Sequence, residues 1–169
     1  MKQFIQNVPD FPREGINFKD VSPLLKDAAA FATAVSLMAR AVDVEEIDYV
    51  AGIEARGFIF GSALANALNL GFIAIRKAGK LPGEIIAQSY NLEYGESSLE
   101  MQRDAVPKRS NVLIVDDILA TGGTAKSAAK LVERIGGRGV GFVFLASLEF
   151  LNGREEIANY HQHTLLTYD

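Results

Sequence analysis

The sequence predicts an α/β fold in which helices flank a central, mainly parallel sheet. Short apolar runs alternate along the chain with longer helical runs. The apolar runs are continuous instead of alternating with polar residues, which is typical of strands covered on both faces. The 169 residues suffice for one domain that buries roughly 70% of its unfolded surface. We therefore expect a single domain over residues 1–169.

The N-terminal part is expected to be an irregular arm followed by a helix and a strand. The stretch Val8–Phe18 holds two prolines and a glycine, which favour irregular structure. The run SPLLKDAAAFATAVSLMARAV, from Ser22, is rich in alanine and has apolar residues at helical spacing. Either Ser22 before Pro23, or Asp27, could cap this helix. Residues 48–53 follow as a short buried strand.

The middle of the chain predicts a turn, a helix, a strand and a hairpin. A turn over Glu54–Gly57 leads into the helical run FIFGSALANALNL. Gly71–Lys77 is predicted to be the next strand. The segment Glu84–Val106 has two β-leaning halves around a polar, glycine-containing middle, as a long hairpin or flap would.

The C-terminal part predicts two strands around one helix. Val112–Val115 is a short run of aliphatic residues, and Gly139–Phe150 is a longer one. Ala125–Ile135 lies between them and has helical character. With the preceding elements, this order completes the alternation that a parallel sheet requires.

Composition excludes several classes of site and partner. The chain has no cysteine, which excludes disulfides and thiolate metal sites. His161 and His163 flank one glutamine without an evident third ligand. The net charge of −4 disfavours a nucleic-acid partner. No apolar run reaches the ~18 residues of a membrane span, and the N-terminus lacks a signal-peptide core, so we expect a cytoplasmic protein without a membrane partner.

Two adjacent carboxylates are expected where a buried strand ends. Asp116 and Asp117 follow the aliphatic run directly. Ligands of open parallel sheets bind beyond the carboxyl ends of the strands. A carboxylate pair there is costly unless a metal ion or donating hydroxyl groups compensate it.

A phosphate-binding turn is predicted immediately after the aspartates. Its glycines permit a tight turn, and the helix that follows offers free N–H groups and a favourable dipole to an anion. Neither a P-loop lysine nor a dinucleotide fingerprint is present. Carboxylates that accept from hydroxyl groups, next to N–H groups that donate to a phosphate, suit a ribose 5-phosphate. Asp117 and Thr121 could instead merely cap a helix. The turn comprises Ala120, Thr121, Gly122, Gly123 and Thr124.

The motif VLIVDDILATGGT resembles the phosphoribosyl-diphosphate motif of type I phosphoribosyltransferases. Further blocks resemble the adenine phosphoribosyltransferases of that family, in order along essentially the whole chain. The resemblance implies the type I fold, with an N-terminal hood at about 1–25 and a flexible flap at about 84–106. It also implies transfer of the 5-phosphoribosyl group from 5-phospho-α-D-ribose 1-diphosphate to adenine, which gives AMP and diphosphate in purine salvage. The blocks are Pro9–Asp27, Gly52–Gly61, Ile75–Gly83, Tyr90–Val106 and Leu148–Glu155.

The resemblance implies roles for individual residues. Residues 120–124 would bind the 5′-phosphate, and the two aspartates would engage the ribose hydroxyls directly or through water on Mg²⁺, which is held mainly by substrate and water. The diphosphate would be bound by Arg56, Arg76, Lys77, Lys80 and Tyr94. The catalytic residues would be Glu93, Asp116, Asp117 and Arg56, and the Glu54–Arg56 turn would be strained or cis.

The base and the oligomeric state are also assigned through the resemblance. Phe18 would stack on adenine, while the backbone of Asn17 and Lys19 would read its edge. Glu93 in the flap could bond to the purine imidazole ring or accept a proton from it. In the family, part of the basic segment around Arg76 reaches a neighbouring subunit, so we expect a homodimer.

Alternatives exist for each of these assignments. Phe18 could close the core, the basic cluster could be a solvated strand end, and the flap could be an ordinary hairpin. A transferase for hypoxanthine or xanthine is disfavoured because the stretch after Ser147 has Glu149 and Asn152 but no lysine to read a 6-oxygen. A DNA-binding regulator on the same fold is disfavoured by the acidic charge and by the lack of an extra domain.

Overall fold

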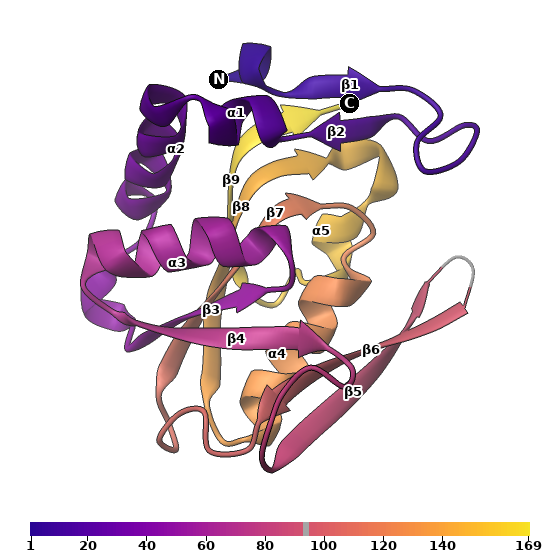
Figure 1. The fold of residues 1–169 in the computed structure, drawn as a ribbon. Coiled ribbons are helices and arrows are strands. Elements are labelled where there is room, and N and C mark those ends of the chain that lie inside the picture. The colour runs from indigo at the N-terminus through magenta and orange to yellow at the C-terminus, as the bar shows by residue number, and fades with distance from the viewer. Residues whose placement is uncertain (93–94) are drawn as a thin grey trace.

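The computed structural model describes residues 1–92 and 95–169, and it confirms the predicted α/β architecture (Figure 1). A seven-stranded sheet has the order β5-β6-β4-β3-β7-β8-β9. The five strands that stand last in this order, β4-β3-β7-β8-β9, are mutually parallel. These strands are β3 (Tyr49–Ile53), β4 (Gly71–Lys77), β7 (Asn111–Leu119), β8 (Arg138–Leu148) and β9 (His161–Tyr168).

Helices cover both faces of the sheet. Leu113 and Val115 of β7 pack in the cluster that includes α2 and α3, whereas Val112 and Ile114 pack in the cluster that includes α4. This two-sided burial explains why the strand is continuously apolar in sequence. Among the described residues, no helix combines the length and apolar character needed to cross a membrane. The helices are α1 (Ser22–Lys26), α2 (Ala28–Arg40), α3 (Arg56–Leu68), α4 (Gly123–Arg134) and α5 (Gly153–Glu156), with 3₁₀ turns at Lys2–Phe4, Val44–Glu46 and Glu149–Leu151.

The predicted long hairpin is present. Strands β5 (Ile85–Leu92) and β6 (Gly95–Gln102) pair antiparallel, and β6 joins the sheet through antiparallel pairs with β4. Arg134 at the end of α4 donates from Nη1 to the carbonyl oxygen of Ala87 at 2.5 Å. The base of the hairpin is therefore tied to the fold, while the described part of β6 before Leu99 extends beyond its pairing with β4 (Figure 1).

A small two-stranded sheet forms a hood at the N-terminus. Strands β1 (Gln6–Val8) and β2 (Phe18–Asp20) pair antiparallel, and Figure 1 shows them at the same end of the molecule as the C-terminus. The sequence predicted an irregular arm here, and the connection over residues 9–17 is irregular. Strands of three residues are too short to produce a readable hydrophobic period, so their pairing was not predicted.

The single helix predicted from Ser22 is wrong in one respect, because it divides into α1 and α2. Asp27 between them has an extended backbone, and its side chain accepts from the Ala30 N–H at 2.9 Å. Of the two predicted capping residues, Ser22 and Asp27, it is thus Asp27 that caps α2. A residue that caps a helix lies outside the helical conformation, so the cap itself interrupts the run.

Candidate functional site

The two aspartates lie inside β7, which corrects the prediction that they follow its end. Strand β3 stops pairing with β7 at Gly52 opposite Val115, whereas β8 pairs with β7 as far as Leu119 opposite Ser147. The longer partner keeps β7 extended through both charged residues. On the β3 side, β7 therefore has no paired strand next to Asp116 and Asp117, which lie just beyond the carboxyl end of β3.

The turn from β3 into α3 covers the part of β7 that extends beyond β3. The Glu54–Ala55 peptide is cis, which is one of the two alternatives that the resemblance left open, and Arg56 is the first residue of α3. A Cβ atom on Gly57 would lie 2.8 Å from Oδ1 of Asp116, so only glycine permits this close approach. Arg56 Nε lies 2.6 Å from Oδ2 of Asp117, which is an ion pair at the base of the site.

The ionisation of the two aspartates is perturbed in the same direction. Burial raises the pKa of Asp116 well above its usual range, and the charge of Asp117 raises it further. Burial also raises the pKa of Asp117, although the neighbouring charge of Arg56 opposes this effect. Asp117 is 4% exposed, and within the described part of the chain its Oδ2 is partnered by the Arg56 ion pair without a well-aligned hydrogen bond. The pair thus favours a cation or hydroxyl donors as partners.

The turn after β7 forms a cradle at the start of α4. Gly122 has a φ of +83° and is the N-cap residue, so its backbone takes a conformation that favours glycine. The backbone of Gly153 in α5 packs directly on the turn, since a Cβ atom there would lie 2.0 Å from the carbonyl oxygen of Ala120. A cavity of about 70 Å³ lies at this turn and is lined by Asp116, Ile118, Leu119, Ala120, Thr121, Gly122, Thr124, Ala125 and Phe144.

The hood brings Phe18 to the arginine of the site. The Arg56 guanidinium lies 4.9 Å from the centroid of the Phe18 ring, and the Phe11 ring packs edge-on at 5.2 Å. Lys19 is buried, with its ammonium donating to Asn7 Oδ1 at 2.7 Å. Since the Lys19 side chain is turned toward the hood, only its backbone is suited to meet a ligand beside Phe18.

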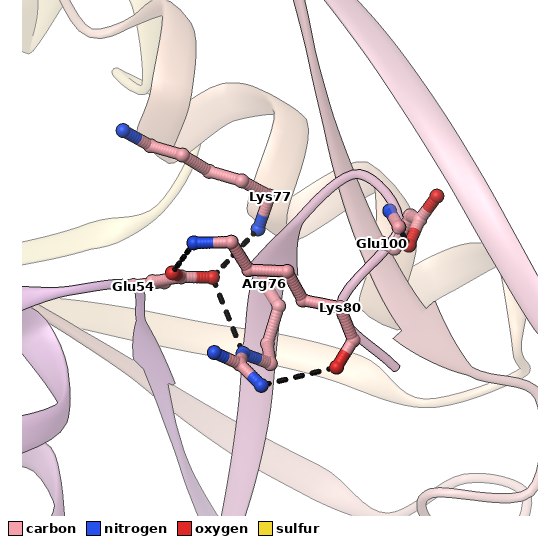
Figure 2. Close-up of polar contacts among 6 residues, drawn as sticks. Glu54, Arg76, Lys77, Lys80 and Glu100 are labelled. Atoms are coloured by element: carbon pink, nitrogen blue, oxygen red, sulfur yellow. Dashed lines mark hydrogen bonds and ion pairs between the residues drawn. The ribbon is translucent and has the colours of Figure 1, made fainter. Parts of the chain in front are cut away.

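The predicted basic cluster is divided between two environments. Arg76 and Lys80 both contact the carboxylate of Glu54, at 3.2 Å and 2.5 Å. The Lys77 ammonium points away from Glu54 (Figure 2). Sequence reasoning gave Glu54 no role, although a carboxylate beside the Arg56 turn at a strand end was a usable signal.

One cavity of about 410 Å³ joins most of these elements. It lies between the α3 turn, the end of β4, the aspartates of β7 and the hairpin. Its lining includes Arg56, Lys77, Asp116, Asp117 and Thr124, together with Glu54, Ala55, Tyr90, Ser97, Leu99 and Ile118. Arg76 and Lys80 do not line it directly. Glu93 and Tyr94 lie outside the described residues.

The two histidines lie at a different place. His161 and His163 line a cavity of about 310 Å³ with Asp43 and Glu46, at the start of β9. Residues 1–92 and 95–169 contain no group of three or more histidine or acidic side chains arranged to hold a metal ion.

Comparisons with known proteins agree with this geometry. The sequence model of the phosphoribosyl transferase domain matches residues 21–161. Adenine phosphoribosyltransferase from Halothermothrix orenii is 52% identical over 166 residues, which are 98% of each chain. The chain belongs to the adenine phosphoribosyltransferase family.

Solved structures of this family have the same fold. The adenine phosphoribosyltransferase of Thermoanaerobacter pseudethanolicus is 47% identical and superimposes with a TM-score of 0.96, covering 99% of this chain and 97% of that one. The enzyme from Saccharomyces cerevisiae, solved with an imino-altritol bisphosphate and adenine, is 43% identical with a TM-score of 0.90, covering 97% and 95%. The family fold therefore extends over the hood and the hairpin as well as the central sheet.

Proposed function

We infer that this chain transfers the 5-phosphoribosyl group from 5-phospho-α-D-ribose 1-diphosphate to adenine, giving AMP and diphosphate in purine salvage. The bond from C1 of the ribose to the diphosphate oxygen breaks, and a bond from C1 to a purine nitrogen forms. The diphosphate leaves with the bonding electrons, and the purine nitrogen loses a proton. The family membership established above supports this reaction.

The observation that carries the proposal is the convergence of four chemically different groups on one site. A phosphate-sized cradle, a carboxylate pair, an arginine and an aromatic ring come from α4, β7, α3 and the hood. Each group matches one part of the two substrates: the 5′-phosphate, the ribose hydroxyls, the diphosphate and the base. An ordinary helix cap would require only the first of them.

The phosphoribosyl group would be held at both ends. The N–H groups that open α4, with the hydroxyls of Thr121 and Thr124, would donate to the 5′-phosphate. Asp116 and Asp117 would accept hydrogen bonds from the ribose hydroxyls, and their charge would stabilise the positive charge that develops at C1. Arg56 and Lys77 would neutralise the leaving diphosphate, with Arg76 and Lys80 as further candidates.

The base would bind under the hood. Phe18 offers an aromatic face beside Arg56, and the backbone of residues 17–19 offers donors and acceptors to the purine edge. The yeast relative was solved with adenine. We propose Glu93 as the group that bonds to the purine imidazole ring during transfer, and Tyr94 as a cover over the diphosphate.

The residues present fit a magnesium ion that is bound chiefly by the diphosphate. Asp116 and Asp117 supply adjacent carboxylates in the 410 Å³ cavity, and burial raises the pKa of both, so a cation beside them would favour their ionised forms. Mg²⁺ prefers few protein ligands and several from phosphate or water. When bound, the ion would neutralise charge on the leaving diphosphate.

We propose a homodimer and a cytoplasmic location. Ile59 and Phe72, on α3 and β4, are large apolar residues that are 40% and 38% exposed. A second subunit would cover such side chains. A cytoplasmic location suits a sugar diphosphate that is too highly charged to cross a bilayer.

The test is diphosphate release with phosphoribosyl diphosphate, Mg²⁺ and one base at a time. We expect turnover with adenine and little or none with hypoxanthine, guanine or xanthine. Turnover with an oxo-purine instead would keep the phosphate site and overturn the assignment of the base. A chain that binds the sugar diphosphate tightly but turns over no base would be a regulator and not an enzyme.

The kcat/KM for phosphoribosyl diphosphate should fall as the pH is lowered. The midpoint of this fall should lie above pH 3.8, which is the ordinary pKa of an aspartate. Burial raises the pKa of both Asp116 and Asp117, whereas hydroxyl donors and cations favour their ionised forms. Protonation as the pH falls through these raised values therefore removes the binding-competent state. A steady-state pH profile measures this effect. A profile that stays flat down to pH 4 would contradict the assigned role of the pair.

A further inference from the structure

Glu54 gathers three donors from the end of β4 and from the turn that follows it (Figure 2). Its side chain is 8% exposed. Its Oε1 lies 2.5 Å from the Lys80 ammonium, and its Oε2 accepts from Arg76 Nε at 3.2 Å and from the Lys77 backbone N–H at 3.0 Å. Two of the cations assigned to the diphosphate are thus already paired with an anion of the protein.

The two cations are held with different strength. Arg76 also donates from Nη1 to the carbonyl oxygen of Lys80 at 3.0 Å, and its guanidinium lies 5.9 Å from the centroid of the Phe58 ring. The side chain of Lys80 is 47% exposed, and its ammonium is held by Glu54. If Lys80 departs, Glu54 retains Arg76 and the Lys77 N–H, so the carboxylate is not left without donors. Lys80 is therefore the cation that can exchange.

The backbone of the turn does not need to move for this exchange. The Gly79 N–H donates to Oε2 of the buried Glu100 at 2.9 Å, and the Ala78 N–H donates to the carbonyl oxygen of Ser98 at 3.3 Å. These bonds fix the turn to β6. Rotation of the flexible four-carbon Lys80 side chain alone would redirect its ammonium.

The diphosphate would lie within reach of this pair. Glu54 lines the 410 Å³ cavity with Arg56, Lys77 and the two aspartates. An anion in that cavity carries more negative charge than one carboxylate and offers more acceptor oxygens, so it competes with Glu54 for the ammonium. Burial raises the pKa of Glu54, but its hydrogen bonds from Lys80, Lys77 and Arg76 lower that pKa to about 2, so the competing carboxylate is ionised at neutral pH.

We propose that Glu54 is an internal counter-ion that competes with the diphosphate for Lys80. Lys80 passes to the diphosphate when the ligand binds and returns to Glu54 when the ligand leaves. The free energy needed to break the Lys80–Glu54 pair on binding lowers the affinity of the native chain for diphosphate and so speeds the release of this product. The inference rests on the proposed function, which assigns Lys80 to the diphosphate.

The test is calorimetric binding of inorganic diphosphate, in the presence of Mg²⁺, to the full chain and its variants. Glu54→Gln keeps the shape of the side chain and removes its charge, so we expect diphosphate to bind about tenfold more tightly. Lys80→Met should weaken binding. The double variant Glu54→Gln/Lys80→Met should bind like Lys80→Met alone, because the tightening requires the lysine. Glu45→Gln, an exposed carboxylate in the 3₁₀ turn before β3, is the control for net charge.

Two results would overturn the exchange. Weaker binding by Glu54→Gln would mean that Glu54 orders the cations for the ligand instead of competing with it. Equal tightening with and without Lys80, or in Glu45→Gln, would mean a general charge effect. Binding of AMP and the melting temperature report whether Glu54→Gln is folded. Glu54→Asp keeps the charge but has a shorter reach to Lys80, so its diphosphate binding should tighten less than that of Glu54→Gln. AMP formation by the unmodified chain tests the proposed function separately. If no AMP forms, the proposed function is wrong. If AMP forms but the Glu54 and Lys80 variants do not bind diphosphate as expected, only the exchange is wrong.

Discussion

Replacing Gly153 with alanine should raise the KM for phosphoribosyl diphosphate at least about 100-fold, because each lost hydrogen bond to a charged group costs about 1.5–3 kcal/mol. The new Cβ would lie 2.0 Å from the Ala120 carbonyl oxygen and 2.9 Å from the Gly122 nitrogen. Both neighbours are backbone atoms that cannot rotate away. The phosphate turn would therefore shift, and its N–H groups would no longer converge on the 5′-phosphate.

The measurement is steady-state kinetics with each substrate varied in turn. The KM for adenine should change far less, because the hood belongs to a different part of the chain. Gly139→Ala is the matched control, since its Cβ would meet side-chain atoms at ordinary distances, the Tyr160 ring at 3.4 Å and the Ala129 Cβ at 3.9 Å. A Gly153→Ala variant that loses thermal stability but keeps its KM for phosphoribosyl diphosphate would show that α5 does not position the turn.

The central sheet could be predicted from sequence because its strands are buried on both faces. Gly71–Lys77 was predicted with both bounds correct, as its apolar run starts after a helix end and stops at charged residues. Strand β9 was not predicted, since an edge strand such as His161–Tyr168 is half polar and has no continuous apolar run. The end of β7 was misplaced because the length of a strand depends on its neighbours, and β8 continues past Asp116.

Parts of the candidate site could be predicted where one short segment carries the whole chemical pattern. The aspartates and the Thr-Gly-Gly-Thr turn lie in one short stretch over residues 116–124, so their combined chemistry is visible in the sequence alone. The partners of Glu54 lie 22 to 26 residues away, and those contacts exist only after β3 and β4 pair. The packing of Gly153 on Ala120 likewise depends on β8 and α5 returning to the turn.

Replacing Arg56 with glutamine should lower kcat/KM for phosphoribosyl diphosphate by about 10- to 100-fold, since the side chain is 36% exposed and one lost hydrogen bond to a charged ligand costs about 1.5–3 kcal/mol. The change removes the cation nearest to the expected diphosphate. It also leaves Asp117, which is 4% exposed, without the charge that opposes the rise of its pKa. Asp117 would then be protonated at a higher pH, so the acidic limb of the pH profile should move toward neutrality.

Arg56→Lys separates the charge of Arg56 from its shape. Lysine restores a positive charge near Asp117, but it cannot both pair with Asp117 and present a planar face 4.9 Å from the Phe18 ring. If charge alone matters, Arg56→Lys should recover most of kcat/KM and return the acidic limb to its original position. If the guanidinium also orders the base pocket, the pH profile should recover while the KM for adenine stays raised. Arg103→Gln, which removes an exposed arginine paired with Glu84, is the control and should leave both constants unchanged. An Arg56→Gln variant with unaltered kinetics would remove Arg56 from the diphosphate site and leave Lys77 as its nearest cation.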